Sequence, residues 1–238
     1  MVCLKDGCLK GNVANAISAL RAGLALVLVG LLHQLFAPHA MPHPLPHTGA
    51  ISAEGLTMMG LWGSWGVWGC FALSVAIIWM DGLDGWAARR LGEASKMGAV
   101  VDILCDRITE MVFWIGYLSL GWVPVAVPLV FLVRGMVVDA LRAMALEQGY
   151  TAFGTTSLQQ TALGVLLTSS RASRWLYAVC KAVVFSLLIL VHHPQASTWP
   201  IYQPLAVGVQ GLVWLTVVFC VIRGLPVLVE SRRLFQTR

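Results

Sequence analysis

The chain has 238 residues, of which 58% are hydrophobic and only 11% are charged, and its formal net charge is +5. Soluble domains carry about 25% charged residues, so this composition excludes an ordinary soluble protein and places most of the chain in a bilayer. Basic loops beside anionic lipid headgroups explain the positive charge. A nucleic-acid partner is not expected, because the sequence has no basic and aromatic recognition motif.

Six apolar stretches are long enough to cross a membrane as helices, which need about 20 residues each. In chain order, the predicted spans are Ile17–Phe36, Leu56–Met80, Met97–Leu120, Trp122–Leu146, Trp175–Val191 and Ile201–Val221. The sequence therefore predicts an all-α integral membrane protein with six transmembrane helices in a single domain, residues 1–238.

The distribution of Lys and Arg predicts the orientation of these spans. Basic residues precede the first span and occur in alternate connections, whereas the segments 37–55, 119–123 and 192–200 contain none. By the positive-inside rule, both termini should lie in the cytoplasm and the protein in the cell membrane. The His- and Pro-rich segment 37–55 is expected to be a solvated, polyproline-like loop on the opposite side, with a soft-metal site as the alternative.

Carboxylates are concentrated in residues 81–106, which read D-G-L-D-G-W-A-A-R-R-L-G-E-A-S-K-M-G-A-V-V-D-I-L-C-D. Asp81 and Asp84 are three residues apart at the end of the second predicted helix. Asp102 and Asp106 are four apart in the third. Each spacing puts the pair on one helical face, so two antiparallel helices can aim four carboxylates at one point.

Such a cluster is costly, because one carboxylate deep in a membrane helix costs about 2.5–3.5 kcal/mol and neighbouring carboxylates repel. Pairing with Arg89, Arg90 or Arg107 would offset only one or two charges. One or two divalent cations would neutralise the set, and all-oxygen ligands favour Mg²⁺ or Mn²⁺. The guanidinium of Arg89 suits phosphate, so metal and arginine beside a lipid phase indicate a diphosphate substrate.

The same segment resembles the signature of the CDP-alcohol phosphatidyltransferases, D-x2-D-G-x2-A-R-x8-12-G-x3-D-x3-D. Every fixed position matches, and these are Asp81, Asp84, Gly85, Ala88, Arg89, Gly98, Asp102 and Asp106. The resemblance implies a membrane transferase of phospholipid biosynthesis that moves a phosphatidyl group from CDP-diacylglycerol to a small alcohol and releases CMP. It also implies a homodimer whose active site faces the cytoplasm.

The resemblance further implies a role for each matching residue. Asp81, Asp84, Asp102 and Asp106 would hold two Mg²⁺ or Mn²⁺ ions, and Asp106 would also be the general base for the acceptor hydroxyl. Upstream, A-N-A-I-S-A-L-R is similar to the family's P-N-x-x-T-x-x-R, with Ala for Pro and Ser for Thr. The implied contacts to the CDP-lipid are Asn15, Ser18, Arg21, Gly85, Ala88, Arg89, Ser95 and Gly98. For Ser18 the alternative is a helix cap.

The acceptor site is predicted on the fourth helix. Arg134 falls near mid-span, where an arginine is a functional candidate by default. The stretch R-G-M-V-V-D-A-L-R-A-M-A-L-E-Q-G resembles R-E-x4-G-L-R-x6-G of phosphatidylglycerophosphate synthases, although Gly135 replaces Glu and Asp139 replaces Gly. Arg134, Arg142 and Arg171 are expected to attract an acceptor phosphate. Glycerol 3-phosphate is the first candidate acceptor, inositol phosphate the second, and a non-phosphorylated alcohol the third.

Other interpretations stay open at this point. The arginines could pair internally, Arg142 with Asp139 and Arg107 with Glu110. A membrane prenyltransferase also binds a metal-diphosphate through aspartates, and a cation transporter could use them as an ion site. Neither explains the D-G-x2-A-R element. An inactive family member would be expected to lack a signature residue, and none is lost.

Overall fold

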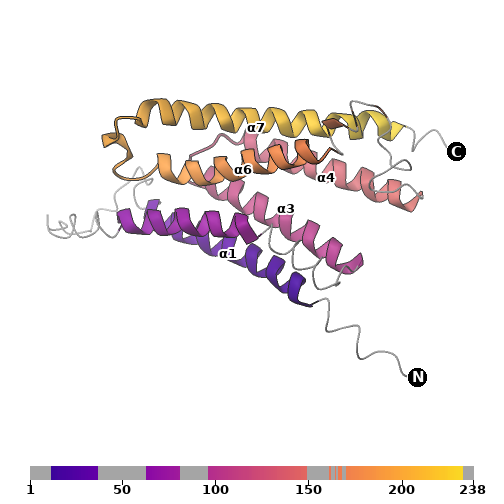
Figure 1. The fold of residues 1–238 in the computed structure, drawn as a ribbon, viewed down its shortest axis with the longest axis horizontal. Coiled ribbons are helices and arrows are strands. Elements are labelled where there is room, and N and C mark those ends of the chain that lie inside the picture. Colours follow the sequence, from indigo (N-terminus) through magenta and orange to yellow (C-terminus); the bar gives the residue numbers. More distant parts are fainter. Residues whose placement is uncertain are drawn as a thin grey trace, which may run out of the picture. The chain divides into compact units, whose positions relative to one another are not determined.

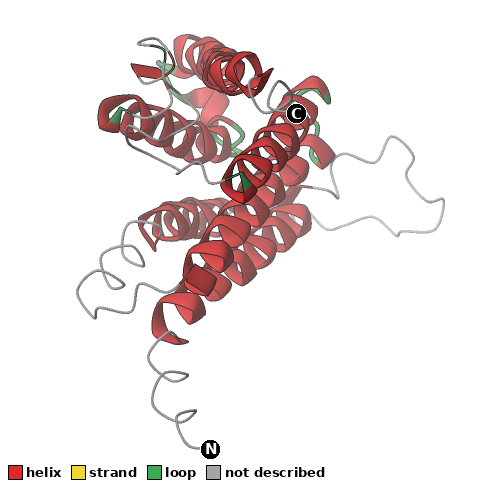
Figure 2. Cartoon of the chain, turned by 90° about the vertical axis from the view of Figure 1, so that its right-hand side faces the viewer, coloured by secondary structure: helices red, strands yellow, loops and turns green. Residues whose placement is uncertain are grey.

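The computed structural model describes residues 12–36, 63–80, 96–148, 161, 164, 166–167 and 170–232. All regular structure in these ranges is helical (Figure 2), which confirms the predicted all-α architecture. The elements are α1 (Asn12–Phe36), the helix Gly63–Met80, α3 (Lys96–Ser119), α4 (Ala126–Glu147), α6 (Arg171–Val191), the 3₁₀ helix η3 (Ala196–Thr198) and α7 (Tyr202–Glu230).

Four of the described helices have the length and apolar composition of membrane spans. They are Asn15–Phe36, Gly63–Met80, Ala172–Val191 and Tyr202–Glu230. The helices α3 and α4 coincide with the third and fourth predicted spans but carry more charged residues. This pattern defines a multi-pass membrane protein, and among its described helices α3 and α4 carry the most charged residues.

Four boundaries of the described helices differ from the sequence prediction by four residues or more. Two are earlier starts, with α1 beginning at Asn12 and not at Ile17, and α6 at Arg171 and not at Trp175. The fourth helix begins at Ala126 and not at Trp122, because Gly121 has a positive φ of 75° and Pro124 disfavours helical backbone in the residue before it. The last helix continues to Glu230, past the predicted end at Val221 and through Pro226. A proline inside a helix costs about 3 kcal/mol. Val227, just beyond the proline, is completely buried, and this burial offsets part of the cost.

The chain divides into two compact units, Met1–Val123 with Phe185–Gln203, and Pro124–Val184 with Pro204–Arg238. The first contains α1, the Gly63–Met80 helix, α3 and the end of α6. The second contains α4, the start of α6 and nearly all of α7. The single-domain prediction stays a prediction.

In the first unit, α1 and α3 lie side by side and run in the same direction (Figure 1). Their register is nearly constant, because residues of α1 contact residues of α3 that lie 84 to 87 positions later in the chain. The matched pairs are Ser18 with Asp102, Arg21 with Asp106, Val29 with Gly116, and His33 with Ser119. This register places the start of α1 against the carboxylate-bearing face of α3.

Gly116 sets how closely the two helices approach. A Cβ atom at this position would lie 2.6 and 2.8 Å from the two Cγ atoms of Val29, which belong to a stiff β-branched side chain. We expect Gly116→Ala to destabilise the protein by about 1–3 kcal/mol, as overpacking does. Thermal unfolding in detergent measures this. Gly23→Ala on α1 is the control, because its Cβ would meet nothing within 4 Å. Equal melting temperatures for both variants would show that the α1–α3 contact accommodates the added methyl group without loss of stability.

Candidate functional site

The polar end of the α1–α3 contact is the candidate active site. Ser18 Oγ donates to Asp102 Oδ1 at 3.4 Å, and Arg21 Nη2 donates to Asp106 Oδ1. Arg21 Nη2 also lies 4.0 Å from Asp102 Oδ1. The structure therefore brings together two of the predicted metal ligands and two of the predicted nucleotide contacts.

The local sequence of α1 explains this arrangement. The buried stripe of α1 recurs every three or four residues and continues from Leu32, Leu28 and Ala25 to Arg21 and Ser18. The contacts that bury the apolar part of the stripe therefore also bury its polar end. Ser18 lies well inside the helix, so the alternative in which it caps a helix start is wrong.

Burial is unequal across this ion pair. The Arg21 side chain is 2% exposed, whereas the side chains of Asp102 and Asp106 are 48% and 49% exposed. The two carboxylates are one helical turn apart on the same face of α3. The site thus combines a buried cation with two accessible carboxylates.

The carboxylates fit a hard divalent cation by their chemistry, since Mg²⁺ and Mn²⁺ prefer oxygen donors of this kind. Among the described residues, no group of three or more His, Cys, Asp or Glu side chains lies close enough together to hold a metal. The other two predicted ligands, Asp81 and Asp84, lie outside the described residues. So do Gly85, Ala88, Arg89 and Ser95, while Asn15 and Gly98 lie one turn before Ser18 and Asp102.

Arg107 forms an ion pair with Glu110 on the same helix. Its Nη1 donates to Glu110 Oε2 at 3.2 Å, one turn further along α3. This confirms one of the two internal pairs considered from the sequence. The other, Arg142 with Asp139, stays a prediction.

A second polar site lies in the other unit, where arginines gather. Arg134 and Arg142 on α4 and Arg174 on α6 all act electrostatically on Arg223 of α7. The buried Arg223 donates from Nη1 to Ser173 Oγ at 2.7 Å, and its guanidinium lies 5.2 Å from the ring centre of Tyr177. Four like charges from three helices repel one another and favour a bound anion.

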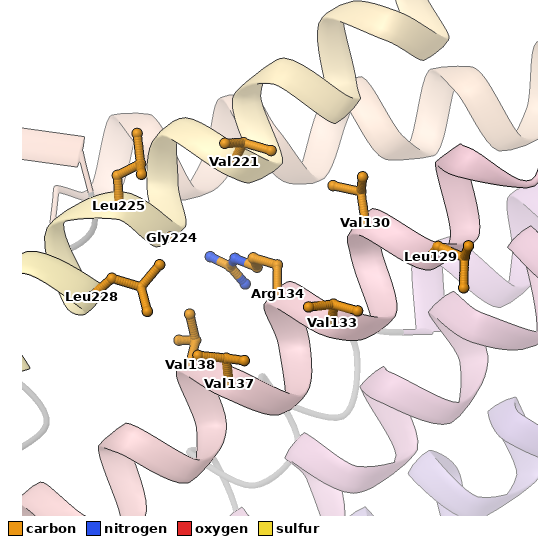
Figure 3. A pocket seen from close by; sticks show the side chains of 10 residues that line it. All are labelled: Leu129, Val130, Val133, Arg134, Val137, Val138, Val221, Gly224, Leu225 and Leu228. Carbon is orange, nitrogen blue, oxygen red and sulfur yellow. The ribbon is translucent and has the colours of Figure 1, made fainter.

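Arg134 lies in an apolar groove of about 440 Å³ between α4 and α7 (Figure 3). A Cβ at Gly224 would lie only 3.0 Å from Arg134 Cγ, so the glycine lets the guanidinium approach the α7 backbone. In the part of the chain that the structure describes, the Nε of Arg134 is buried and has no hydrogen-bond partner. The other lining residues are Leu129, Val130, Val133, Val137, Val138, Val221, Leu225 and Leu228.

The sequence analysis did not identify Arg223, because the sixth predicted span, Ile201–Val221, leaves this residue outside the membrane helices. In the structure α7 continues to Glu230, seven residues beyond Arg223, so Arg223 lies inside the helix. Of the three predicted acceptor contacts, Arg134 and Arg142 act on the same guanidinium. Arg171 is the first residue of α6, one turn before Arg174.

A histidine–serine pair in the first unit is not a catalytic dyad. His193 Nε2 and Ser64 Oγ are 3.0 Å apart, and the backbone N–H of Gln195 donates to His193 Nδ1 at 3.1 Å. The neutral ring therefore carries its proton on Nε2, whereas a base for Ser64 needs that nitrogen free. Burial lowers the pKa of His193, which keeps the ring neutral.

The fold and the polar face of α3 define a multi-pass helical membrane protein with a carboxylate site. Residues 11–222, most of the chain, match the sequence model of the CDP-alcohol phosphatidyltransferase family. The chain belongs to this family, whose members transfer a phosphatidyl group from a CDP-alcohol to an acceptor. It is therefore a membrane transferase of phospholipid biosynthesis. No curated protein sequence matches the chain significantly.

Proposed function

We propose that the chain transfers the phosphatidyl group of CDP-diacylglycerol to a small phosphorylated alcohol, with glycerol 3-phosphate as the first candidate, and releases CMP. The observation that carries the proposal is the pair of accessible carboxylates, Asp102 and Asp106, held against α1 in a chain that belongs to this family. Inositol phosphate is the second candidate acceptor.

In this reaction Asp106 accepts the proton of the acceptor hydroxyl. The oxygen then forms a bond to the β-phosphorus of CDP-diacylglycerol, the bond from that phosphorus to the CMP oxygen breaks, and CMP leaves. A carboxylate can act as the base because it lies half exposed on α3, where an acceptor can reach it. Asp102, one turn earlier, faces the same side.

Asp81, Asp84, Asp102 and Asp106 would together hold two Mg²⁺ or Mn²⁺ ions. When bound, such ions clamp the transferring phosphoryl group and neutralise charge on the leaving group. The carboxylate chemistry of Asp102 and Asp106 supports this assignment. The family match favours it over a prenyltransferase or a cation transporter.

The preference for a phosphorylated acceptor rests on the arginines of the second unit. Arg134 has a buried Nε without a partner among the described residues, and a charged group in that state is costly unless a ligand pairs with it. Arg142, Arg174 and Arg223 add to the same positive field. A phosphomonoester supplies the compensating charge and the oxygens that suit guanidinium groups.

The nucleotide contacts and the assembly complete the proposal. Asn15, Ser18, Gly85, Ala88, Arg89, Ser95 and Gly98 are proposed to line the CDP-lipid site. The protein is proposed to be a homodimer in the cell membrane with its active site facing the cytoplasm, in agreement with the basic segments at both ends of the sequence.

The test is CMP release by the purified protein in detergent with CDP-diacylglycerol, Mg²⁺ or Mn²⁺, and a panel of acceptors. We expect release with glycerol 3-phosphate and none with glycerol, serine or choline. CMP release only with an unphosphorylated alcohol would agree with the family assignment, but it would contradict the proposed role of the arginines in binding an acceptor phosphate. The absence of release with every acceptor, from folded protein, would contradict the proposed activity.

A further inference from the structure

We infer that Arg21 is a positioning residue that holds the carboxylate of Asp106, and that it does not contact the nucleotide. The inference rests on the proposed function, because it takes Asp106 as the base of that reaction. It differs from the role that the sequence resemblance implied for Arg21, and it follows from the contacts between α1 and α3.

Burial is the first argument. A side chain that binds a nucleotide must present its donors to the substrate, but the Arg21 side chain is 2% exposed. The two carboxylates that it meets are about half exposed. A substrate at this site can therefore reach Asp102 and Asp106, whereas the Arg21 guanidinium is shielded from it.

The contact pattern is the second argument. Arg21 Nη2 donates to Asp106 Oδ1 and lies 4.0 Å from Asp102 Oδ1, which accepts a hydrogen bond from Ser18. The hydrogen bond goes to Asp106, whereas Asp102 lies beyond hydrogen-bond distance of the same nitrogen. The guanidinium is planar and pre-organised, so it holds the acceptor in a more defined orientation than the flexible ammonium group of lysine does.

The register of the helices is the third argument. Arg21 lies on the same buried stripe as Ala25 and Leu28, and the α1–α3 contact continues to Val29 and Gly116. The apolar contacts fix the start of α1 relative to α3 and so place the guanidinium beside Asp106. A misplacement of about 1 Å in a reacting group can cost about 100-fold in rate.

The test compares Arg21→Lys with wild type in two assays on the full-length protein in detergent. Steady-state CMP release gives kcat and KM for CDP-diacylglycerol, and calorimetric titration with CMP gives the dissociation constant and the number of sites. We expect kcat to fall about 10- to 100-fold, with KM, CMP affinity and the number of CMP sites unchanged. Arg107→Lys, on α3 beside Asp106 but paired with Glu110, is the matched control and should behave as wild type.

Each other outcome overturns the inference. A tenfold loss of CMP affinity or a tenfold rise in KM would make Arg21 a nucleotide contact, and a reduced number of CMP sites would make it a residue needed only for folding. An unchanged kcat would show that Arg21 does not position Asp106 for the reaction. If wild type releases no CMP, the proposed function fails, but the calorimetric comparison still decides whether Arg21 contacts the nucleotide.

Discussion

Replacing Asp106 by Asn should lower kcat for CMP release by at least about 100-fold, because a positioned general base contributes about 10²- to 10⁴-fold to a proton transfer. The amide keeps the size of the side chain and can still accept a hydrogen bond from Arg21. It cannot take a proton from the acceptor hydroxyl. The measurement is the initial rate of CMP release at saturating CDP-diacylglycerol and glycerol 3-phosphate.

This substitution also removes the charge that accepts the hydrogen bond of the buried Arg21 guanidinium and leaves the more distant Asp102 carboxylate, 4.0 Å away, so some loss of stability accompanies the loss of rate. The carboxylate of Asp106 is half exposed, so we expect less than the roughly 3–5 kcal/mol typical of breaking a fully buried pair. Glu110→Gln is the matched control. It breaks the ion pair with Arg107 one turn further along the same helix, outside the proposed site.

The two variants separate chemistry from folding. Glu110→Gln should lower the melting temperature and keep a kcat within about threefold of wild type. Asp106→Asn should lower both the melting temperature and kcat. Should Asp106→Asn retain more than a tenth of the wild-type kcat, Asp106 is not the base, and another group must accept the proton.

Hydropathy was sufficient to predict where the helices lie, because a helix that crosses a bilayer needs a long apolar run whatever its neighbours are. The ends were harder to predict. The sequence around Val221 contains Arg223, Gly224 and Pro226, which locally favour a helix end. The helix nevertheless passes through all three, and burial of Val227 offsets part of the cost of the proline.

The periodicity of α3 predicted that Asp102 and Asp106 share a face, since that depends only on residues within one helix. The partner of Asp106 could not be predicted in the same way. Arg21 is 85 residues earlier in the chain, and only the register of α1 against α3 brings the two together. Local patterns thus gave the chemical groups of the site, and tertiary contacts decided which of them meet.

The arginines of the second unit show the same limit. Arg134 and Arg142 share a helix and could be assigned together from their spacing. Arg223 joins them from α7, and its hydrogen bond to Ser173 of α6 depends on side-chain packing that no sequence period encodes. Arg134 is therefore the sharpest test of the acceptor assignment, because it lies in an apolar groove and its Nε has no protein partner among the described residues.

We expect Arg134→Met to raise KM for glycerol 3-phosphate by about 10- to 150-fold, which corresponds to losing one hydrogen bond to a charged group. KM for CDP-diacylglycerol should not change. The same substitution should raise the melting temperature, because it removes a guanidinium whose buried Nε has no partner among the described residues and replaces it with an apolar side chain of similar length. Initial-rate kinetics and thermal unfolding measure the two effects on one preparation.

The substitution is expected to weaken acceptor binding and, at the same time, to stabilise the protein. This combination distinguishes an acceptor contact from a residue with a folding role. Replacing a residue that is needed only for folding would destabilise the protein, and it would not raise the KM of one substrate alone. Arg232→Met controls for the change in net charge, because Arg232 is exposed just beyond α7 and outside the groove. An unchanged KM for glycerol 3-phosphate in Arg134→Met, together with a higher melting temperature, would show that the groove does not hold the acceptor phosphate. Such a result would favour an unphosphorylated acceptor, because the anion that the arginines attract would then not be the substrate.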